Sequence, residues 1–375
     1  MWHAAHLLPT GLATRKIDDI YHTIRENNNP LSGTGFLNGH LGISLFYYLY
    51  SQHVSQKSVF AESVASFESG LNILDTNPEI NYPLHCTELC AVSQQLAGAG
   101  VLSLDPNRLL REWDEILLSK MRTALRQMNV GGFATGAMGY GLYFLSRACY
   151  NPDRFAPVIR ELTDSLDQYA ISSQQACHWC PDQRVALTLW NGQAAVILFL
   201  ACAADYGFID KKRVYTMIGK AVNFLSFQLK HQPFSNLLSV HLGDLGTGYA
   251  LLRAGQTFEN EHWQASALEI LGKRAGTYLA NGASTEPAGI LTGVAGAAIA
   301  FDKVFSLTRN QLFSAAADLS YTAILSRLQD QPTGHISKSS RCDLCFGTGL
   351  SGIGSSLIKM LHRENIRCGH HLWLI

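Results

Sequence analysis

Cysteine and histidine side chains recur in this 375-residue sequence at spacings that could hold a metal ion. Cys177, His178 and Cys180 form the densest group, and Cys342 and Cys345 form a second pair with two residues between them. Thiolates and imidazoles are the usual protein ligands of zinc, but a single Cys-x-x-Cys pair is a weak zinc signal. We interpret the first group as a packed loop or a redox-sensitive pair.

Other side chains could move a proton or contact a substrate. His241 could act as a base if it stays neutral, as a histidine among helix N-termini tends to do. Asp244 follows Gly243, and a carboxylate in the first turn of a helix is favoured by the helix dipole, so a structural role is also open. Trp190 could stack on a bound peptide beside Asn191, although an aromatic side chain at such a place also packs.

Most of these residues lie in or beside a short glycine motif that recurs along the chain. Seven copies start from positions 39, 88, 136, 192, 243, 293 and 349, which are 48 to 56 residues apart. Six of these positions are glycine, and Glu88 takes its place in the second copy. A constant period of this length is typical of one repeat architecture.

The segments around the motifs have two helical patterns. Residues 107–128 place apolar side chains on one face and charged side chains off it, as in a helix with one solvated side. Residues 195–200, after a motif, are apolar on every side and must be surrounded by protein. Seven helices of each kind predict an all-α fold, an α/α toroid of fourteen helices, in a single domain over residues 1–375.

The motif also predicts how the buried helices begin. An Asn or Thr precedes the first motif position in six copies, including Thr135, Asn191 and Thr292, and these residues are good N-caps. Gly or Ala stands three positions after it in every copy, which predicts close approach of neighbouring helices. We expect seven helix N-termini to direct free amides at a shared cavity.

Composition excludes several classes of function. A formal net charge of zero gives no support to nucleic-acid binding, and no apolar run is long enough to span a membrane. Nine cysteines are too few for a disulfide scaffold in a chain of this length. The first residues lack the pattern of a secretory signal, so we expect a cytoplasmic protein.

The sevenfold pattern resembles the lanthionine synthetase C-like family, the cyclases of lantibiotic-type peptide biosynthesis, most specifically at residues 241–246 and 288–296. The resemblance implies a toroidal cyclase in which zinc activates a peptide cysteine for addition to a dehydroamino acid of a precursor peptide. It also implies that two cysteines and a histidine bind the zinc. Those positions correspond here to His241, Leu291 and Thr292.

The resemblance implies two further losses. The proton-transfer histidine of the family corresponds to Asn191, and its acidic partner corresponds to Gly132. Because Leu291 offers no donor atom, we predict no metal and no cofactor. A relocated metal site that uses Cys86 or Cys345 remains an alternative, beside their interpretation as small buried hydrophobic residues.

Two functions follow from this comparison. In the first, the protein forms thioether rings in a dehydrated precursor peptide without zinc, with His241, Asn191 and Asp244 as catalytic residues. We expect the following residues to contact the peptide: Trp190, Thr292, Thr135, Cys86 and Cys345. In the second, the protein is a non-catalytic subunit that binds the precursor or a partner dehydratase. A terpene-cyclase or glycosidase activity ranks last, because the sequence has no Asp-Asp-x-x-Asp motif.

Overall fold

The computed structural model describes residues 10–27, 35, 37–76, 82–179, 187–231, 238–283, 286–330 and 344–362. Cys180 and Cys342 lie outside these ranges. The chain divides into two compact units, each described by itself below. Unit 1 comprises residues 1–80, 95–103 and 274–375, and unit 2 comprises residues 81–94 and 104–273.

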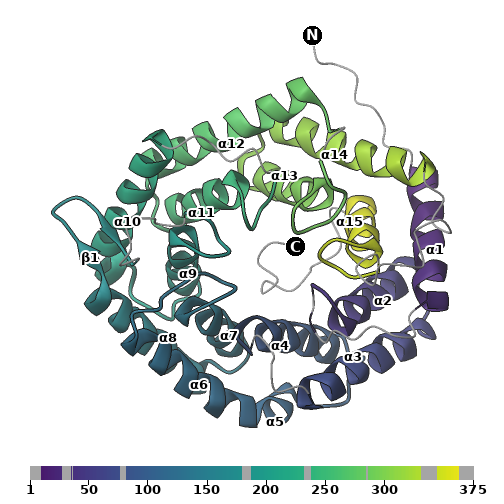
Figure 1. The fold of residues 1–375 in the computed structure, drawn as a ribbon, viewed down its shortest axis with the longest axis horizontal. Helices are drawn as coiled ribbons and strands as arrows, with labels where there is room; N and C mark the ends of the chain where they lie inside the picture. Colours follow the sequence, from purple (N-terminus) through teal and green to yellow (C-terminus); the bar gives the residue numbers. More distant parts are fainter. Residues whose placement is uncertain are drawn as a thin grey trace. The chain divides into compact units, whose positions relative to one another are not determined.

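Seven helices begin at or near the glycine motif, and we call them motif helices (Figure 1). They are α2 (His40–Val54), α4 (Tyr82–Gly98), α7 (Ala137–Tyr150), α9 (Gln193–Asp205), α11 (Asp244–Thr257), α13 (Val294–Thr308) and α15 (Leu350–Leu361). In α9, every residue from Gln193 to Ala201 is buried, which confirms that helices apolar on all sides are surrounded by protein.

Seven intervening helices alternate with the motif helices. They are α1 (Thr10–Asn27), α3 (Val59–Thr76), α6 (Arg111–Arg126), α8 (Pro152–Tyr169), α10 (Lys211–His231), α12 (Glu261–Asn281) and α14 (Gln311–Asp330). Within the described residues, the structure adds the four-residue α5 (Pro106–Leu109) and two short strands, β1 (Ile171–Ser172) and β2 (Cys177–His178). The fourteen predicted helices are therefore present.

Unit 2 has two helical layers. The motif helices α7, α9 and α11 pack side by side, and α6, α8 and α10 cover them (Figure 1). The antiparallel strands β1 and β2 pair Ile171 with His178 and Ser172 with Cys177. Cys177 is buried, and burial raises the pKa of its thiol to about 12. It therefore behaves as a packed apolar side chain.

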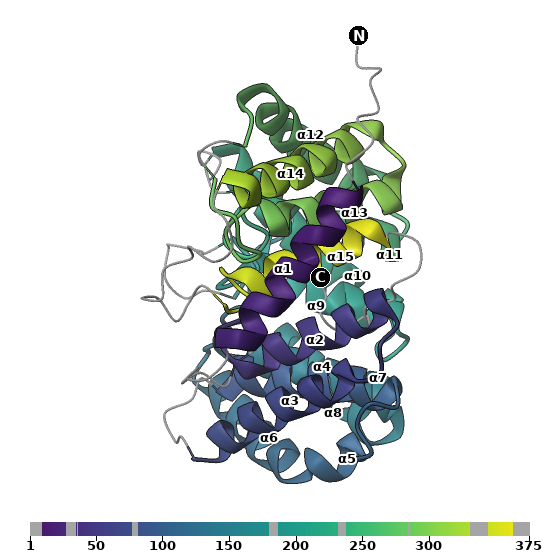
Figure 2. The same ribbon diagram turned by 90° about the vertical axis from the view of Figure 1, so that its right-hand side faces the viewer.

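Unit 1 brings helices from the two ends of the described chain together. The motif helices α13, α15 and α2 form one layer, which α14, α1 and α3 cover. Helix α1 packs against α15, and α15 packs against α2 (Figure 2). The last repeat is thus joined to the first within this unit.

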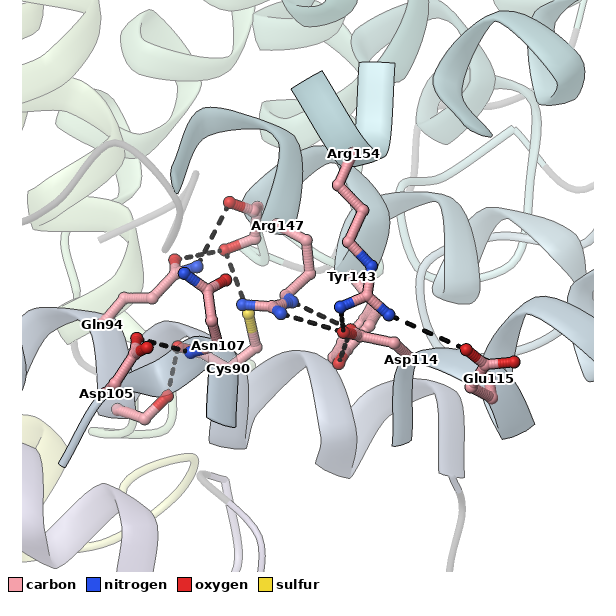
Figure 3. Close-up of polar contacts among 11 residues, drawn as sticks. Cys90, Gln94, Asp105, Asn107, Asp114, Glu115, Tyr143, Arg147 and Arg154 are labelled. Carbon is pink, nitrogen blue, oxygen red and sulfur yellow. Dashed lines mark hydrogen bonds and ion pairs between the residues drawn. The ribbon is translucent and has the colours of Figure 1, made fainter. Parts of the chain in front are cut away.

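A buried ion pair fixes α6 against α7 in unit 2 (Figure 3). Arg147 donates from Nε and Nη2 to the two carboxylate oxygens of Asp114, each at 2.9 Å, and Tyr143 donates its hydroxyl to Asp114 Oδ1 at 2.7 Å. Arg147 also lies 4.7 Å from the ring centre of Phe155. Because a buried charge costs several kcal/mol unless it is paired, these contacts favour one register of the two helices.

A second polar contact holds α4 against α7. Ser146 of α7 donates its hydroxyl to Gln94 Oε1 at 2.9 Å, and Gln94 Nε2 donates to the Ser146 carbonyl at 3.3 Å (Figure 3). Cys90 donates its thiol to Ser146 Oγ at 3.5 Å. All three side chains are buried, so the face of α4 that carries Cys90 is fixed toward α7.

No helix among the described residues is both long and apolar enough to cross a bilayer.

Candidate functional site

The first glycine of the motif is itself the N-cap. This holds for Gly39, Gly136, Gly192, Gly243, Gly293 and Gly349, and at none of these caps does a side chain bond to the helix. The prediction that the preceding Asn or Thr caps each helix was therefore wrong by one residue. At position 136 the backbone itself requires glycine, because the φ of 70° lies in the left-handed region that other residues avoid.

Loop backbone, rather than side chains, satisfies first-turn amides of α7, α9, α13 and α15. In α13, the amides of Val294 and Ala295 donate to the carbonyls of Pro287 and Ala288, seven residues earlier, at 2.9 and 3.2 Å. Ser351 in α15 donates in the same way to Leu344 at 3.3 Å. The expectation of free amides directed at a cavity was wrong here, because each loop folds back over the first turn.

The second glycine of the motif leaves room for the same folded-back loop. A Cβ atom at Gly246 would overlap the carbonyl oxygen of Val240, six residues earlier. Gly296 and Gly352 stand in the same relation to the carbonyls of Ile290 and Phe346. The predicted reason for small residues, close approach of neighbouring helices, is thus secondary to a contact of each loop with its own helix.

Backbone hydrogen bonds also join successive motif loops at the position two residues before the first glycine. In unit 2, Ala134 donates to the carbonyl of Trp190 at 3.1 Å, and Trp190 donates to the carbonyl of His241 at 2.9 Å. In unit 1, Leu291 donates to Gly347 and Gly347 to Leu37, each at 2.8 Å. His241 and Leu291 therefore occupy equivalent places in this series of bonds.

His241 and Trp190 are the predicted site residues that the structure brings into contact. Their rings meet edge to face, with centres 5.7 Å apart. His241 is buried, and burial lowers the pKa of its imidazole to about 4, so it is neutral at pH 7. An unperturbed thiol has a pKa near 8.5, so full proton transfer to His241 would cost about 6 kcal/mol. The imidazole is a hydrogen-bonding group and a weak base.

Three other predicted residues lie near this contact in sequence or in the equivalent loop. Asn191 and Thr135 are exposed. Trp190 is half-buried, and so is more exposed than His241. Asp244 is buried in the first turn of α11, where the helix dipole favours a carboxylate.

The structure leaves no room for a side chain at Gly132. A Cβ atom there would overlap the carbonyl oxygen of Trp190 and the amide nitrogen of Asn191. The acidic residue that the resemblance places at this position is thus absent, and the neighbouring motif loop fills the volume that it would need.

Cys86 lies in the protein core. It is fully buried, one helical turn before Cys90, and burial raises the pKa of its thiol. Its electrostatic neighbours include Lys120 of α6 and Tyr140 of α7. The side chain is therefore directed between α4, α6 and α7, as a small buried hydrophobic residue would be.

The predicted residues of unit 1 lie in the motif loops before α13 and α15. Leu291 and Thr292 are half-buried at the start of α13. Cys345 is buried, and its sulfur lies 3.2 Å from the hydroxyl oxygen of Thr348.

The residues present do not fit a zinc ion. Zinc in proteins takes about three or four nitrogen, sulfur or carboxylate ligands. His241 is a donor, but Leu291 has none and the Thr292 hydroxyl is a poor one. Within the residues that the structure describes, no three His, Cys, Asp or Glu side chains gather as a metal site.

A histidine–glutamate pair at the start of α4 is absent from the predicted site residues. His85 Nδ1 lies 3.1 Å from Glu88 Oε2, and 20% of the His85 side chain is exposed, against 5% for Glu88. The signal in the sequence is a break in the repeat. Glu88 replaces the first glycine, and His85 stands three positions earlier, where the other six copies carry an apolar residue.

Comparison with known proteins agrees with this architecture. A structure search finds a nisin cyclase with a TM-score of 0.71 and 14% identity, covering 96% of this chain and 97% of that chain. At that identity the likeness shows the fold, an α/α toroid. No curated protein matches the sequence. The profile described as lanthionine synthetase C-like protein matches residues 10–368. The chain therefore belongs to the lanthionine synthetase C-like family.

Proposed function

We propose that this lanthionine-cyclase-like protein acts on a dehydrated ribosomal precursor peptide and forms thioether rings without the zinc of its family. The observation that carries the proposal is the series of motif loops. The family profile matches residues 10–368 and backbone hydrogen bonds join successive motif loops, while the positions that correspond to the zinc ligands hold His241, Leu291 and Thr292.

Addition of a thiol to a dehydroamino acid needs orientation and a proton acceptor, both of which a protein can supply without a metal. Holding two reacting groups in a productive geometry can itself contribute several kcal/mol to a rate. Trp190 offers a half-buried aromatic surface, and Asn191 and Thr135 offer exposed polar groups on adjoining loops. His241 is neutral and packs against the Trp190 ring, which it helps to hold in place.

The test uses a synthetic peptide that carries one dehydroalanine and one downstream cysteine. The peptide is incubated with the protein in a strong chelator, and ring closure is followed by the loss of alkylatable thiol and by chiral analysis of the lanthionine. We expect faster loss of thiol than in buffer and an excess of one stereoisomer. Equal rates and a racemic product would reject ring formation by this protein.

The alternative is a non-catalytic subunit that binds the precursor peptide or a partner dehydratase. The observation that favours it is that His241 is a weak base, because burial lowers the pKa of its imidazole to about 4. This alternative predicts that the same peptide binds with unchanged affinity to a His241→Ala variant, while the wild-type protein closes no ring. Fluorescence anisotropy of a labelled peptide measures that affinity.

A further inference from the structure

The second repeat differs from the other six in both sequence and backbone. Its helix, α4, begins at Tyr82, six residues before the motif position 88, whereas the other motif helices begin one residue after it. The residues that form a loop elsewhere are therefore helical here. This helical turn carries His85 and Glu88, which are three residues apart and so lie on one face.

That face is directed away from the neighbouring helices of unit 2. Cys86 and Cys90 are about 40° apart around α4, and they face α6 and α7 through Lys120, Tyr140 and Ser146. Glu88 stands about 200° around the helix from Cys86. His85 is the partly exposed member of the pair, with 20% of its side chain accessible, while Glu88 is buried.

The geometry of the pair determines which imidazole nitrogen is available. A carboxylate at 3.1 Å from Nδ1 accepts the Nδ1 hydrogen, which leaves the lone pair on Nε2. The same carboxylate stabilises the imidazolium that forms when Nε2 takes a proton. One-fifth of the His85 side chain is exposed, while Glu88 stays buried.

We propose that His85, oriented by Glu88, is the base that accepts the proton of the substrate cysteine; this rests on the proposed thiol addition. The S–H proton moves to His85 Nε2, and the S–Cβ bond forms as the π bond of the dehydroamino acid breaks. The imidazolium then returns the proton to Cα, so that no oxidant, reductant or metal is consumed.

His241 is the weaker candidate for this step. Its imidazole is buried by protein, and its pKa is lowered to about 4. A base works best when its pKa lies near the working pH. His85 is partly exposed and lies beside the Glu88 carboxylate, which holds its ring in one orientation.

The experiment separates proton transfer from ring closure. A peptide with serine in place of dehydroalanine has a free cysteine but cannot cyclise. Its alkylation by iodoacetamide is followed from pH 5.5 to 8 with saturating protein. We expect the wild-type protein to raise the alkylation rate at pH 6.5 about tenfold or more, because an imidazolium–thiolate pair forms at lower pH than a free thiolate.

The variants distinguish a catalytic base from a histidine–glutamate pair that only stabilises α4. His85→Asn keeps an amide donor toward Glu88 but lacks a basic nitrogen, so the pH profile should return to that of the free peptide with peptide affinity unchanged. Glu88→Gln should weaken the effect, and added imidazole should restore it in His85→Ala. His262→Asn, an exposed position on α12, is the matched control and should behave as the wild type.

Two outcomes would overturn the assignment. One is a wild-type profile that coincides with that of the free peptide, and the other is a His85→Asn profile that coincides with that of the wild type. By contrast, a shifted profile combined with no ring closure of the dehydroalanine peptide would refute the proposed function and leave the base in place.

Discussion

At the scale of single residues, His241 stands at a position where the family resemblance implies a zinc ligand, and its burial makes protonation of its imidazole unfavourable. It occupies the first zinc-ligand position implied by the family resemblance, touches the Trp190 ring and is buried. Burial disfavours the charged form of an imidazole, so its pKa falls from about 6.5 to about 4. In the unfolded chain the same side chain takes up a proton near pH 6.5.

This difference predicts that His241 makes the protein acid-labile. The unfolded state binds a proton below pH 6.5 that the folded state binds only near pH 4, so the stability present above pH 6.5 is lost as the pH falls. By pH 4 the loss attributable to this residue reaches about 3 kcal/mol.

The measurement is the urea unfolding of the wild type and of His241→Gln at pH 7 and pH 4. The variant should lose less free energy of unfolding than the wild type between these values. The exposed control His262→Gln should lose as much as the wild type. Parallel losses in all three proteins would show that His241 is protonated in the folded state above pH 4.

Sequence reasoning reached residues such as His241 and Leu291 because the motif fixes their place in the repeat. It could not assess Gly132, where the neighbouring loop excludes any side chain, since that overlap involves backbone atoms of Trp190 and Asn191. It also missed His85, although the break in the repeat at Glu88 was visible, because only the structure shows α4 extended through these residues.

At the scale of helices and loops, the glycine motif allows each loop to pack its backbone against the start of its own helix. The motif loop folds back, its carbonyls accept the first helical amides, and its second glycine makes space for the carbonyl six residues earlier. The helices themselves were predictable, because apolar periodicity reports burial directly. The way in which the helix N-termini are capped was not predictable, because hydrogen bonds between backbone groups do not depend on the type of side chain.

The folded-back loop predicts opposite effects for two glycine-to-alanine changes. Alanine normally stabilises a helix interior by about 1 kcal/mol relative to glycine. At Gly246 the added Cβ would overlap the Val240 carbonyl and lie 2.7 Å from a methyl group of Leu189, so we expect a destabilisation of about 2–4 kcal/mol.

Gly276, within α12, provides the matched control because a Cβ there would meet nothing within 4 Å. Gly276→Ala should be neutral or stabilising by about 0.5–1 kcal/mol. Thermal unfolding followed by circular dichroism compares the two variants. A Gly246→Ala protein as stable as Gly276→Ala would show that the loop does not need to rest on the helix.

At the scale of the whole molecule, the fold and the chemistry of the family are separable. The repeat period, the alternation of helices and the family match extend over the chain, and they predict the α/α toroid without reference to any ligand. The single domain predicted over residues 1–375 stays a prediction. A zinc site needs particular donors at three positions, which is a requirement separate from the apolar pattern that packs the helices.

The central claim is that this chain keeps the cyclase fold without the family's metal. Elemental analysis of protein purified without chelator and dialysed in zinc-free buffer tests it most directly. We predict zinc far below one ion per chain, with thermal stability unchanged by added chelator, because a structural or catalytic zinc would contribute to folding. One tightly held zinc ion per chain, whose removal lowers the melting temperature, would contradict the claim.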